Sequence, residues 1–176
     1  QDLRHSIRTV TQEPFLFSDT VENNIAFAIE DRPEDWQEHF PSLLQQAALR
    51  EEVDKFPLQE QTIVGEKGIL LSGGQKQRIS LARSMATSCD LLILDNVLSA
   101  VDYETERYLL QQIFARRQAK SLLIVSHRVT AVEKADWILV LDVLVLGYVG
   151  AMPAEGLYLL IARVATAYYF IHFLVI

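Results

Sequence analysis

Leu71-Ser72-Gly73-Gly74-Gln75-Lys76-Gln77-Arg78 opens a predicted helix that runs from Gln75 to about Thr87. The start of a helix leaves backbone N–H groups unpaired and carries a partial positive charge, so it suits an anion such as a phosphate. Glycines let the phosphates of a ligand approach the backbone, and Ser72 adds a hydroxyl donor. Taken alone, a Ser-Gly-Gly turn is more often only a turn, so its interpretation depends on the motifs around it.

The composition and net charge of the chain exclude some classes of protein. The chain has 176 residues, enough for one domain with a core, and its net charge of −7 argues against a nucleic-acid binder, which normally presents a basic face. Cys89 is the only cysteine, which excludes an intrachain disulfide and is typical of a reducing compartment. The sequence starts at Gln1, and we expect it to be a piece of a longer protein.

Charged residues are distributed very unevenly along the chain. Residues 137–176 contain only Asp142, Glu155 and Arg163, whereas the preceding 136 residues contain the other 36 of the 39 charged side chains. A shift this sharp predicts a boundary near residues 135–142, with a part in water before it and a part in lipid after it.

The order of the predicted elements changes at the Ser-Gly-Gly turn. Before it, residues 17–70 are expected to form a mainly helical subdomain, which includes a helix over Ser42–Lys55. After it, a helix is expected over Thr105–Arg117, between continuous apolar runs that predict strands buried on both faces. These runs are Leu91–Leu94, Leu122–Val125 and Ile138–Leu141. The alternation of strands and helices predicts an α/β fold with a parallel sheet.

Polar residues follow two of these predicted strands. Asp95 comes directly after the first run, and His127 follows the second within Ser126-His127-Arg128. The carboxyl edge of a parallel sheet is where α/β proteins place their ligands, and a carboxylate there commonly holds Mg²⁺. Each residue has a plain structural alternative, because Asp95 and Asp102 can cap helices and a lone histidine is more often structural. Since two polar residues end neighbouring strands, we predict a site at this edge.

Five motifs in this order resemble the nucleotide-binding domain of an ABC transporter. They are Thr11–Pro14 with Leu16-Phe17, Leu71–Arg78, Leu91–Asp95, Ser99–Asp102 and Ser126–Arg128. Order and spacing match over residues 1–141, and the pattern is most similar to exporters whose transmembrane and ATPase parts share one chain. The resemblance implies a P-loop-NTPase-like parallel sheet with a helical subdomain, and it implies ATP and Mg²⁺ as cofactors.

The resemblance also implies roles for single residues of this chain. Gln12 resembles the loop glutamine that senses Mg²⁺ and couples to the membrane domain, and Val64–Gly68 resembles a loop that contacts the transmembrane helices. Asp95 resembles the Walker B aspartate that holds Mg²⁺, Asp102 the residue that signals across the dimer, and His127 the switch histidine. Four residues resemble the signature that meets the γ-phosphate: Ser72, Gly73, Gly74 and Gln75.

Two departures from the family pattern bear on activity. The chain contains no G-x-x-x-x-G-K-[ST], the loop that cradles the β- and γ-phosphates, and we expect that loop to have been lost by truncation upstream of Gln12. Asn96 follows Asp95 where the family usually has a glutamate as general base, a role that contributes on the order of 10²–10⁴-fold in rate. An amide cannot accept a proton at neutral pH, so the isolated chain is expected to be inactive as an ATPase. The alternative is that Asn96 still positions the water and some turnover survives.

These features imply the degenerate half of a heterodimeric exporter. Family dimers hold each ATP between the phosphate loop of one domain and the signature of the other, and here the signature is intact while the local base is missing. The implied partners are a second nucleotide-binding domain, with a heterodimer favoured over a homodimer, and the transmembrane domains of an exporter. The implied location is the cytoplasmic face of the plasma (inner) membrane. Two alternatives stay open: a non-catalytic regulatory half-site, and a fragment of a cytochrome b-type membrane subunit.

Residues 142–176 are predicted to form a hydrophobic helical tail. Leu157–Ile176 is 20 residues long, enough to cross the ~30 Å hydrocarbon core of a bilayer, and a buried soluble helix is the alternative. Residues 137–176 resemble the C-terminal helical hairpin of bacterial cytochrome b, which implies membrane residence without a haem, so His172 is not expected to be a ligand. The two resemblances overlap at Trp137–Asp142. Because residues 137–149 would give the first hairpin helix a length of only roughly 20 Å, we expect a chimera.

Overall fold

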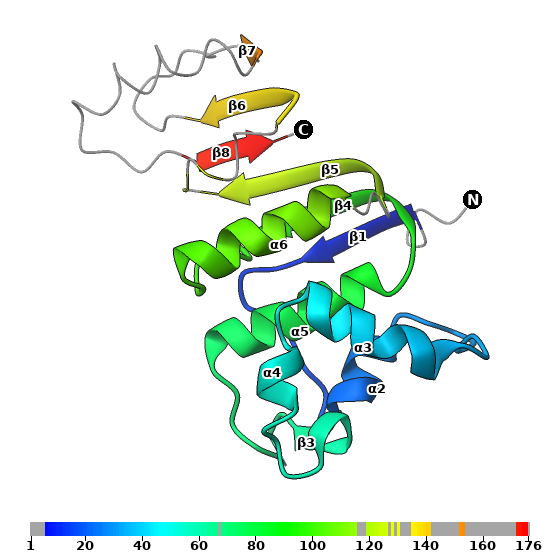
Figure 1. Cartoon of the computed structure of the whole chain (residues 1–176). Coiled ribbons are helices and arrows are strands. Elements are labelled where there is room, and N and C mark those ends of the chain that lie inside the picture. Colours follow the sequence, from blue (N-terminus) through cyan, green and yellow to red (C-terminus); the bar gives the residue numbers. More distant parts are fainter. Residues whose placement is uncertain are drawn as a thin grey trace.

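The structure is a computed structural model that describes residues 6–66, 68–115, 119–126, 128, 130, 135–141, 152–153 and 172–175. Figure 1 shows two parts within these residues. One is a sheet with a long helix beside it, and the other is a group of shorter helices.

The sheet has six strands in the order β1-β4-β5-β8-β6-β7. Their bounds are β1 Ile7–Val10, β4 Cys89–Asp95, β5 Ala119–Ser126, β6 Trp137–Leu141, β7 Met152–Pro153 and β8 His172–Val175. β1, β4 and β5 pair in parallel, and β8 runs antiparallel to both β5 and β6, so β6 points in the same direction as β5. The predicted α/β fold with a parallel sheet is therefore confirmed, and the carboxyl ends of β1, β4 and β5 lie at one edge.

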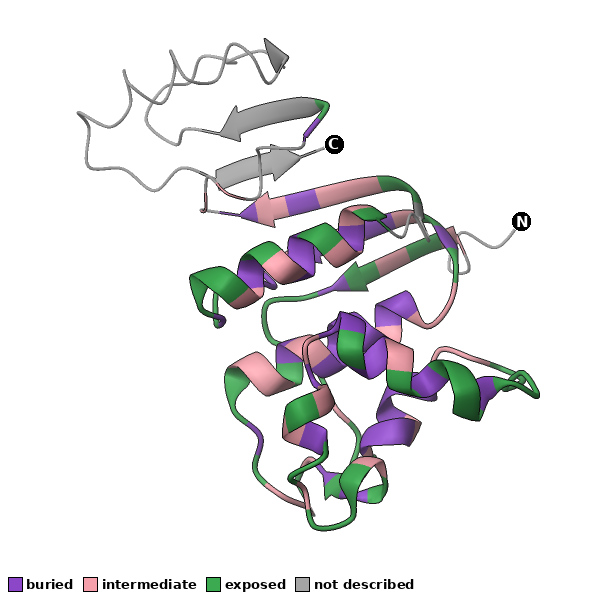
Figure 2. Ribbon diagram, in the orientation of Figure 1, coloured by how far each residue is buried: buried purple, intermediate pink, exposed green. Residues whose placement is uncertain are grey.

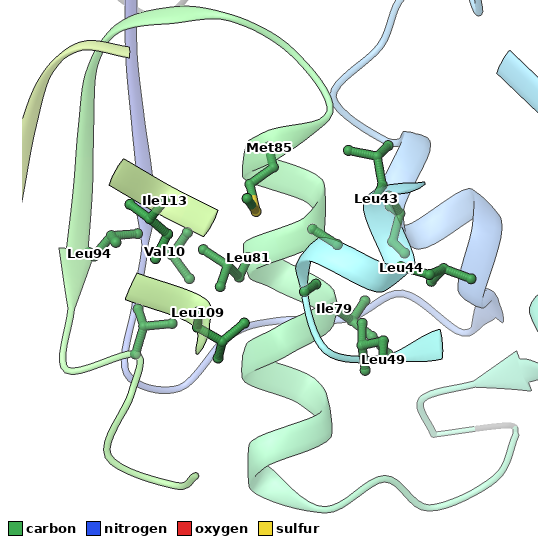
Figure 3. Packing of buried hydrophobic residues seen from close by; sticks show 14 of the residues in the cluster. Val10, Leu43, Leu44, Leu49, Ile79, Leu81, Met85, Leu94, Leu109 and Ile113 are labelled. Carbon is green, nitrogen blue, oxygen red and sulfur yellow. The ribbon is translucent and has the colours of Figure 1, made fainter. Parts of the chain in front are cut away.

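The central strand β4 is more deeply buried on one face than on the other. Leu92 and Leu94 are buried, whereas Leu91 and Ile93 on the opposite face are only half-buried. The helices α5 (Gly73–Met85) and α6 (Tyr103–Ala115) both contribute to the apolar cluster around Leu94. Figure 3 shows that cluster, which includes Val10, Leu81, Met85, Leu109 and Ile113. The prediction that the apolar run of β4 is buried on both faces is thus only half correct, because the described helices pack on the face of Leu94.

The shorter helices precede the Ser-Gly-Gly turn in the chain and lie around α5 (Figure 1). They are α2 Val21–Ala26, α3 Trp36–Gln46 and α4 Arg50–Val53, with the 3-10 turn η1 Gln59–Gln61 and the hairpin of β2 Asp19–Thr20 and β3 Ile63–Val64. The helix expected over residues 42–55 is interrupted, because Ala48 lies in the left-handed region with φ +52° and separates α3 from α4. The helix also begins earlier than Ser42, so Pro41 lies inside α3.

Both parts share one apolar core, and α5 stands between them. Ile79 of α5 lies near Leu44 of α3 and near Leu49, which precedes α4, whereas Leu81 and Met85 lie toward the sheet (Figure 3). Figure 2 shows α5 buried along most of its length, while its first turn reaches the surface. The packing therefore fixes α5 firmly and presents its N-terminal end, the Ser-Gly-Gly turn, to solvent.

The structure corrects the prediction for the tail. His172–Val175, expected at the end of a membrane helix, forms β8 and pairs its backbone with both β5 and β6. Trp137–Leu141 is a strand of the sheet, which confirms the strand predicted over Ile138–Leu141. Met152–Pro153 pairs with it as β7, so neither segment belongs to a helical hairpin. In the part of the chain that the structure describes, no helix combines the length and the apolar character needed to cross a bilayer. The other residues of the 142–176 prediction lie outside the described ranges.

Candidate functional site

The first turn of α5 is closed by reciprocal hydrogen bonds. Ser72 is the N-cap, and its Oγ accepts from the backbone N–H of Gln75 at 3.2 Å, while Gln75 Oε1 accepts from the backbone N–H of Ser72 at 2.8 Å. This capping box explains why the helix begins here. Because the oxygen of the Ser72 hydroxyl acts as the acceptor within the capping box, the proton of that hydroxyl is free to be donated to a ligand. Ser72 and Gly73 are exposed, so the turn offers a hydroxyl and backbone donors to an anion in solution.

The two glycines of the turn have different surroundings. A Cβ atom built on Gly73 would meet nothing within 4 Å, whereas one built on Gly74 would lie 2.8 Å from the carbonyl oxygen of Ala100. Gly74 therefore allows close contact between α5 and the loop that follows β4. Gly73 instead leaves open space beside the exposed hydroxyl of Ser72.

This difference predicts opposite effects of alanine at the two glycines. Gly73→Ala should stabilise the fold by about 0.5–1 kcal/mol, because alanine restricts the unfolded chain and meets no neighbour. Gly74→Ala should destabilise it by about 1–3 kcal/mol, because the new methyl group displaces Ala100. Urea denaturation of the two variants measures both values. Equal effects of the two substitutions would contradict the contact between Gly74 and the Ala100 loop.

Asp95 and Asn96 lie where β4 ends. Both are half-buried, and the backbone N–H of Asn96 donates to the carbonyl of Val125 in β5 at 2.9 Å. The carbonyl of Asn96 accepts from the backbone N–H of Ser99 at 3.2 Å and from its hydroxyl at 2.8 Å. Asn96 has φ +53°, a region that asparagine tolerates better than most residues. The backbone conformation at position 96 therefore favours asparagine, whatever the catalytic role of its amide.

The carboxylate of Asp102 caps α6. Its Oδ1 accepts from the backbone N–H of Thr105 at 3.0 Å, and its Oδ2 accepts from the Thr105 hydroxyl at 2.7 Å. Hydrogen bonds from the Thr105 backbone and then from its side chain hold the pKa of Asp102 below its ordinary value. The side chain is exposed, so the capping role predicted as the alternative is present and the carboxylate still faces solvent.

The lowered pKa of Asp102 predicts how its cap responds to acid. The carboxylate stabilises the fold above its ordinary pKa of 3.8, and this contribution is lost as the pH falls through the lower value of the folded state. The stability difference between wild type and Asp102→Ala should therefore be constant at neutral pH and shrink in acid. Urea denaturation across this pH range measures it, with Asp102→Asn as the control that keeps an acceptor without the charge. A difference that grows in acid would contradict the assignment.

A buried glutamine links the loop of Gln12 to α5. Gln12 is exposed, but its backbone carbonyl accepts from Nε2 of Gln77 at 3.0 Å. Gln77 is only 4% exposed, one turn beyond the Ser-Gly-Gly turn. No role for Gln77 was predicted from the sequence. Its position within the motif Leu71–Arg78 is the signal that could have marked it, because its burial is seen in the structure alone.

The structure brings several of the predicted site residues together. The turn of Ser72–Gly74 lies against the loop that joins Asn96 to Asp102, and the loop of Gln12 is tied to the same helix. His127 lies outside the described residues. Among the residues that the structure does describe, no three His, Cys, Asp or Glu side chains form a metal-binding group.

Comparison with known proteins gives two family matches. The model of the family "ABC transporter" matches residues 1–99, and that of "Cytochrome b(C-terminal)/b6/petD" matches residues 107–170. The second match overlaps β5 and β6, which are strands of the sheet and not helices of a hairpin.

Individual relatives are similar over the larger part of the chain. The multidrug resistance-like ATP-binding protein MdlA of Escherichia coli is 41% identical over 139 residues, which cover 79% of this chain and 23% of that protein. An ATP-dependent lipid A-core flippase of Pseudomonas aeruginosa is 40% identical over 142 residues, or 81% of this chain and 23% of that protein. The structure of a bacterial Atm1-family ABC exporter with ATP bound matches 92% of this chain and 27% of its own, with a TM-score of 0.78 and 30% identity. The chain thus spans about a quarter of the length of these relatives.

Proposed function

This chain belongs to the ABC transporter family, and we propose that it serves an exporter by completing a nucleotide site with its signature turn. In this proposal the ATP is held by a second nucleotide-binding domain. The observation that carries it is the exposed, internally capped turn of Ser72 and Gly73, whose hydroxyl and backbone donors face solvent. The relatives named above include a multidrug resistance-like ATP-binding protein and a lipid A-core flippase, which supports an exporter as the whole protein.

The donor set fits Mg·ATP. Backbone N–H groups at a helix start and a serine hydroxyl suit the γ-phosphate, and the open space at Gly73 leaves room for it. Asp95 and the side chain of Gln12 belong to this chain's own half-site and not to the one that the turn completes, and there they would hold Mg²⁺ through oxygen atoms, which are the ligands that this ion prefers. When bound, Mg²⁺ neutralises charge that develops on the phosphates during phosphoryl transfer. The turn itself contributes by positioning and by electrostatic stabilisation.

We further propose that the chain is the degenerate half of a heterodimer. Asn96 occupies the position at the end of β4 where a glutamate would act as general base, and its amide has no basicity for that role at neutral pH. Position 96 has φ +53°, which asparagine adopts more readily than most residues, and this explains why asparagine is tolerated there in place of glutamate. The proposed site on the second domain depends on the signature turn and not on Asn96. That site can therefore hydrolyse ATP even though the site that includes Asn96 hydrolyses it poorly.

The proposed partner on the membrane side docks on an exposed aromatic patch. Phe15 meets Phe17 edge to face with ring centroids 5.1 Å apart, and the centroids of Phe17 and Phe27 are 4.4 Å apart. Arg83 lies over the rings of Phe17 and Phe27. A Cβ on Gly65 would lie 3.0 Å from the carbonyl oxygen of Phe17, so Gly65, in the loop expected to contact the transmembrane helices, adjoins the patch. Large exposed aromatic groups of this kind mark interaction sites. Such docking would place the chain at the cytoplasmic face of the inner membrane.

The decisive experiment supplies the missing half of the site in trans. The full chain is mixed with an acceptor domain, defined as an exporter nucleotide-binding domain that has a G-x-x-x-x-G-K-[ST] loop and a base glutamate but whose own signature serine is replaced by alanine. The acceptor domain alone cannot form a productive site, so we expect its Mg·ATPase to rise when the chain is added. The chain alone should be inactive. An absence of stimulation at saturating chain concentration would refute the proposed function.

The substitution Asn96→Glu separates the two parts of the proposal. The ATP hydrolysed in the mixture lies against the base glutamate of the acceptor domain, so a base restored at position 96 should leave the stimulated rate unchanged. Asn96→Ala serves as the control for any disturbance of the turn at the end of β4. A stimulated rate that rises with Asn96→Glu would show that the chain holds the hydrolysed nucleotide itself, and would contradict the assignment.

A further inference from the structure

A buried carboxylate lies in the first turn of α6. Glu106 is only 1% exposed, and its backbone N–H donates to the carbonyl of Asp102 at 2.9 Å. Its Oε2 accepts from Nη1 of Arg128, and its Oε1 accepts from the hydroxyl of Thr130. A carboxylate is rarely buried to this extent unless it is paired and hydrogen-bonded, and here each oxygen has one charged or polar donor.

The guanidinium of Arg128 reaches from this carboxylate to the loop before α6. Its Nη2 donates to the carbonyl of Ser99 at 3.1 Å and to that of Val101 at 3.2 Å. The backbone N–H of Arg128 donates to Oγ of Ser126 at 3.0 Å, which fixes the residue to the end of β5. Arg128 therefore joins three elements: its side chain links α6 to the loop of residues 99–101, and its backbone N–H links both to the end of β5.

The loop of residues 99–101, whose carbonyls Arg128 binds, is the loop that contacts the signature turn. Ala100, whose carbonyl oxygen meets the position of a Cβ on Gly74, lies between the two residues whose carbonyls Arg128 holds. The same loop leads directly into Asp102. A shift of these carbonyls would move the surface on which the start of α5 rests.

We infer that Glu106 and Arg128 form a positioning pair that sets the placement of the Ser72–Gly74 turn for the nucleotide of the second domain. Neither residue touches the nucleotide, and both act through the loop of residues 99–102. The planar fork of arginine is required, since it spans an acid on one side and two carbonyls on the other, whereas the single ammonium of lysine cannot reach both. The effect on catalysis rests on the proposed function, but the effect on the loop does not.

The test uses Arg128→Lys in the full chain, with Thr130→Val as the matched control. The lysine variant keeps a charge for Glu106 but loses the bonds to the loop, whereas the valine variant removes one bond to Glu106 and keeps the arginine fork. Hydrogen–deuterium exchange of residues 99–102 should rise roughly tenfold in Arg128→Lys and stay near wild type in Thr130→Val. Exchange in α3 serves as the internal reference. Glu106→Gln gives a second variant, with the same expected rise, should the lysine variant fold poorly.

Kinetics in the presence of the acceptor domain distinguish positioning from general stability. Misplacement of the turn should lower the stimulated kcat on the order of 10–100-fold, while the chain concentration for half-maximal stimulation stays unchanged. Loss of folded protein alone would raise that concentration and leave kcat at saturation intact. Loop exchange equal to wild type in both Arg128→Lys and Glu106→Gln, or an unchanged kcat, overturns the inference. Failure of the wild-type chain to stimulate overturns the proposed function instead, and the exchange result still decides whether the pair holds the loop.

Discussion

Aspartate in place of Ser72 will leave the chain folded and abolish its stimulation of the acceptor domain. Aspartate caps a helix as well as serine does, because its carboxylate accepts the same hydrogen bond from the N–H of Gln75. A negative charge also suits the N-terminus of a helix. The same charge would face the γ-phosphate and repel it. We expect the free energy of unfolding to stay within about 0.5 kcal/mol of wild type, and the stimulated rate to fall on the order of 10²–10³-fold.

Alanine at the same position provides the matched comparison. Ser72→Ala removes both the cap and the hydroxyl donor, so it should destabilise the fold by about 1 kcal/mol and also lower the stimulated rate. Urea denaturation ranks the variants by stability, and ATPase assays at saturating chain concentration rank them by rate. If Ser72→Asp stimulated like wild type while Ser72→Ala did not, Ser72 would act only as a helix cap, and its proposed contact with phosphate would be wrong.

The parts of the fold that depend on neighbouring residues could be predicted from the sequence. The apolar runs that became β4 and β5 stand out because each is bounded by polar residues, and the start of α5 is marked by Ser72 and Gln75, which cap it together. The cap of α6 by Asp102 is equally local. These features need only a few consecutive residues to form, so the sequence contains all the information for them.

The contacts that hold the candidate site together could not be predicted in this way. Gln77 donates to the carbonyl of Gln12, which is 65 positions away, and Gly74 meets a carbonyl of the loop after β4. Arg128 bonds to Glu106 and to two backbone carbonyls. Such pairs are set by how the elements pack, and no periodicity in the sequence indicates which distant carbonyl a buried amide or guanidinium reaches.

The error in the tail has a different cause. A continuous apolar run is compatible with a membrane helix, a buried helix or a buried strand, and periodicity alone does not separate them. His172–Val175 lies in such a run and forms a strand, because the edges of β5 and β6 satisfy its backbone groups. The partner strands precede it by tens of residues, so nothing within the run itself indicates the pairing.

The helices before the signature turn are joined by a second buried acid. Glu22 of α2 accepts three hydrogen bonds at Oε1, at distances of 2.7–3.3 Å, and one at Oε2 of 2.5 Å. Its donors are Arg32, Trp36, Gln37 and Gln61. They come from the loop before α3, from α3 itself and from η1, so a single carboxylate links three segments of this part of the molecule.

Leucine at position 22 will therefore destabilise the fold strongly. Glu22→Leu keeps the size of the side chain but leaves the buried indole N–H of Trp36 and the amide of Gln61 without an acceptor. Removing one partner of a buried ionic network costs about 3–5 kcal/mol, and the lower end applies here because Arg32 is half-exposed and can turn to water. We expect a loss of about 3 kcal/mol in the free energy of unfolding, measured by urea denaturation.

Two further variants show whether the acceptor atoms or the charge alone produce this loss. Glu22→Gln retains one acceptor for Trp36, and the amide of Gln61 can rotate to offer its oxygen to the new NH₂ group, so the loss should fall to about 1 kcal/mol. Glu51→Leu removes the same charge from an exposed position on α4 and should change stability by less than about 0.5 kcal/mol. If Glu22→Leu were as mild as Glu51→Leu, the donors around Glu22 would be satisfied by water, and the carboxylate could not be what holds α2, α3 and η1 together. A loss with Glu22→Gln as large as with Glu22→Leu would show that the negative charge, and not the number of acceptors, stabilises this part of the domain.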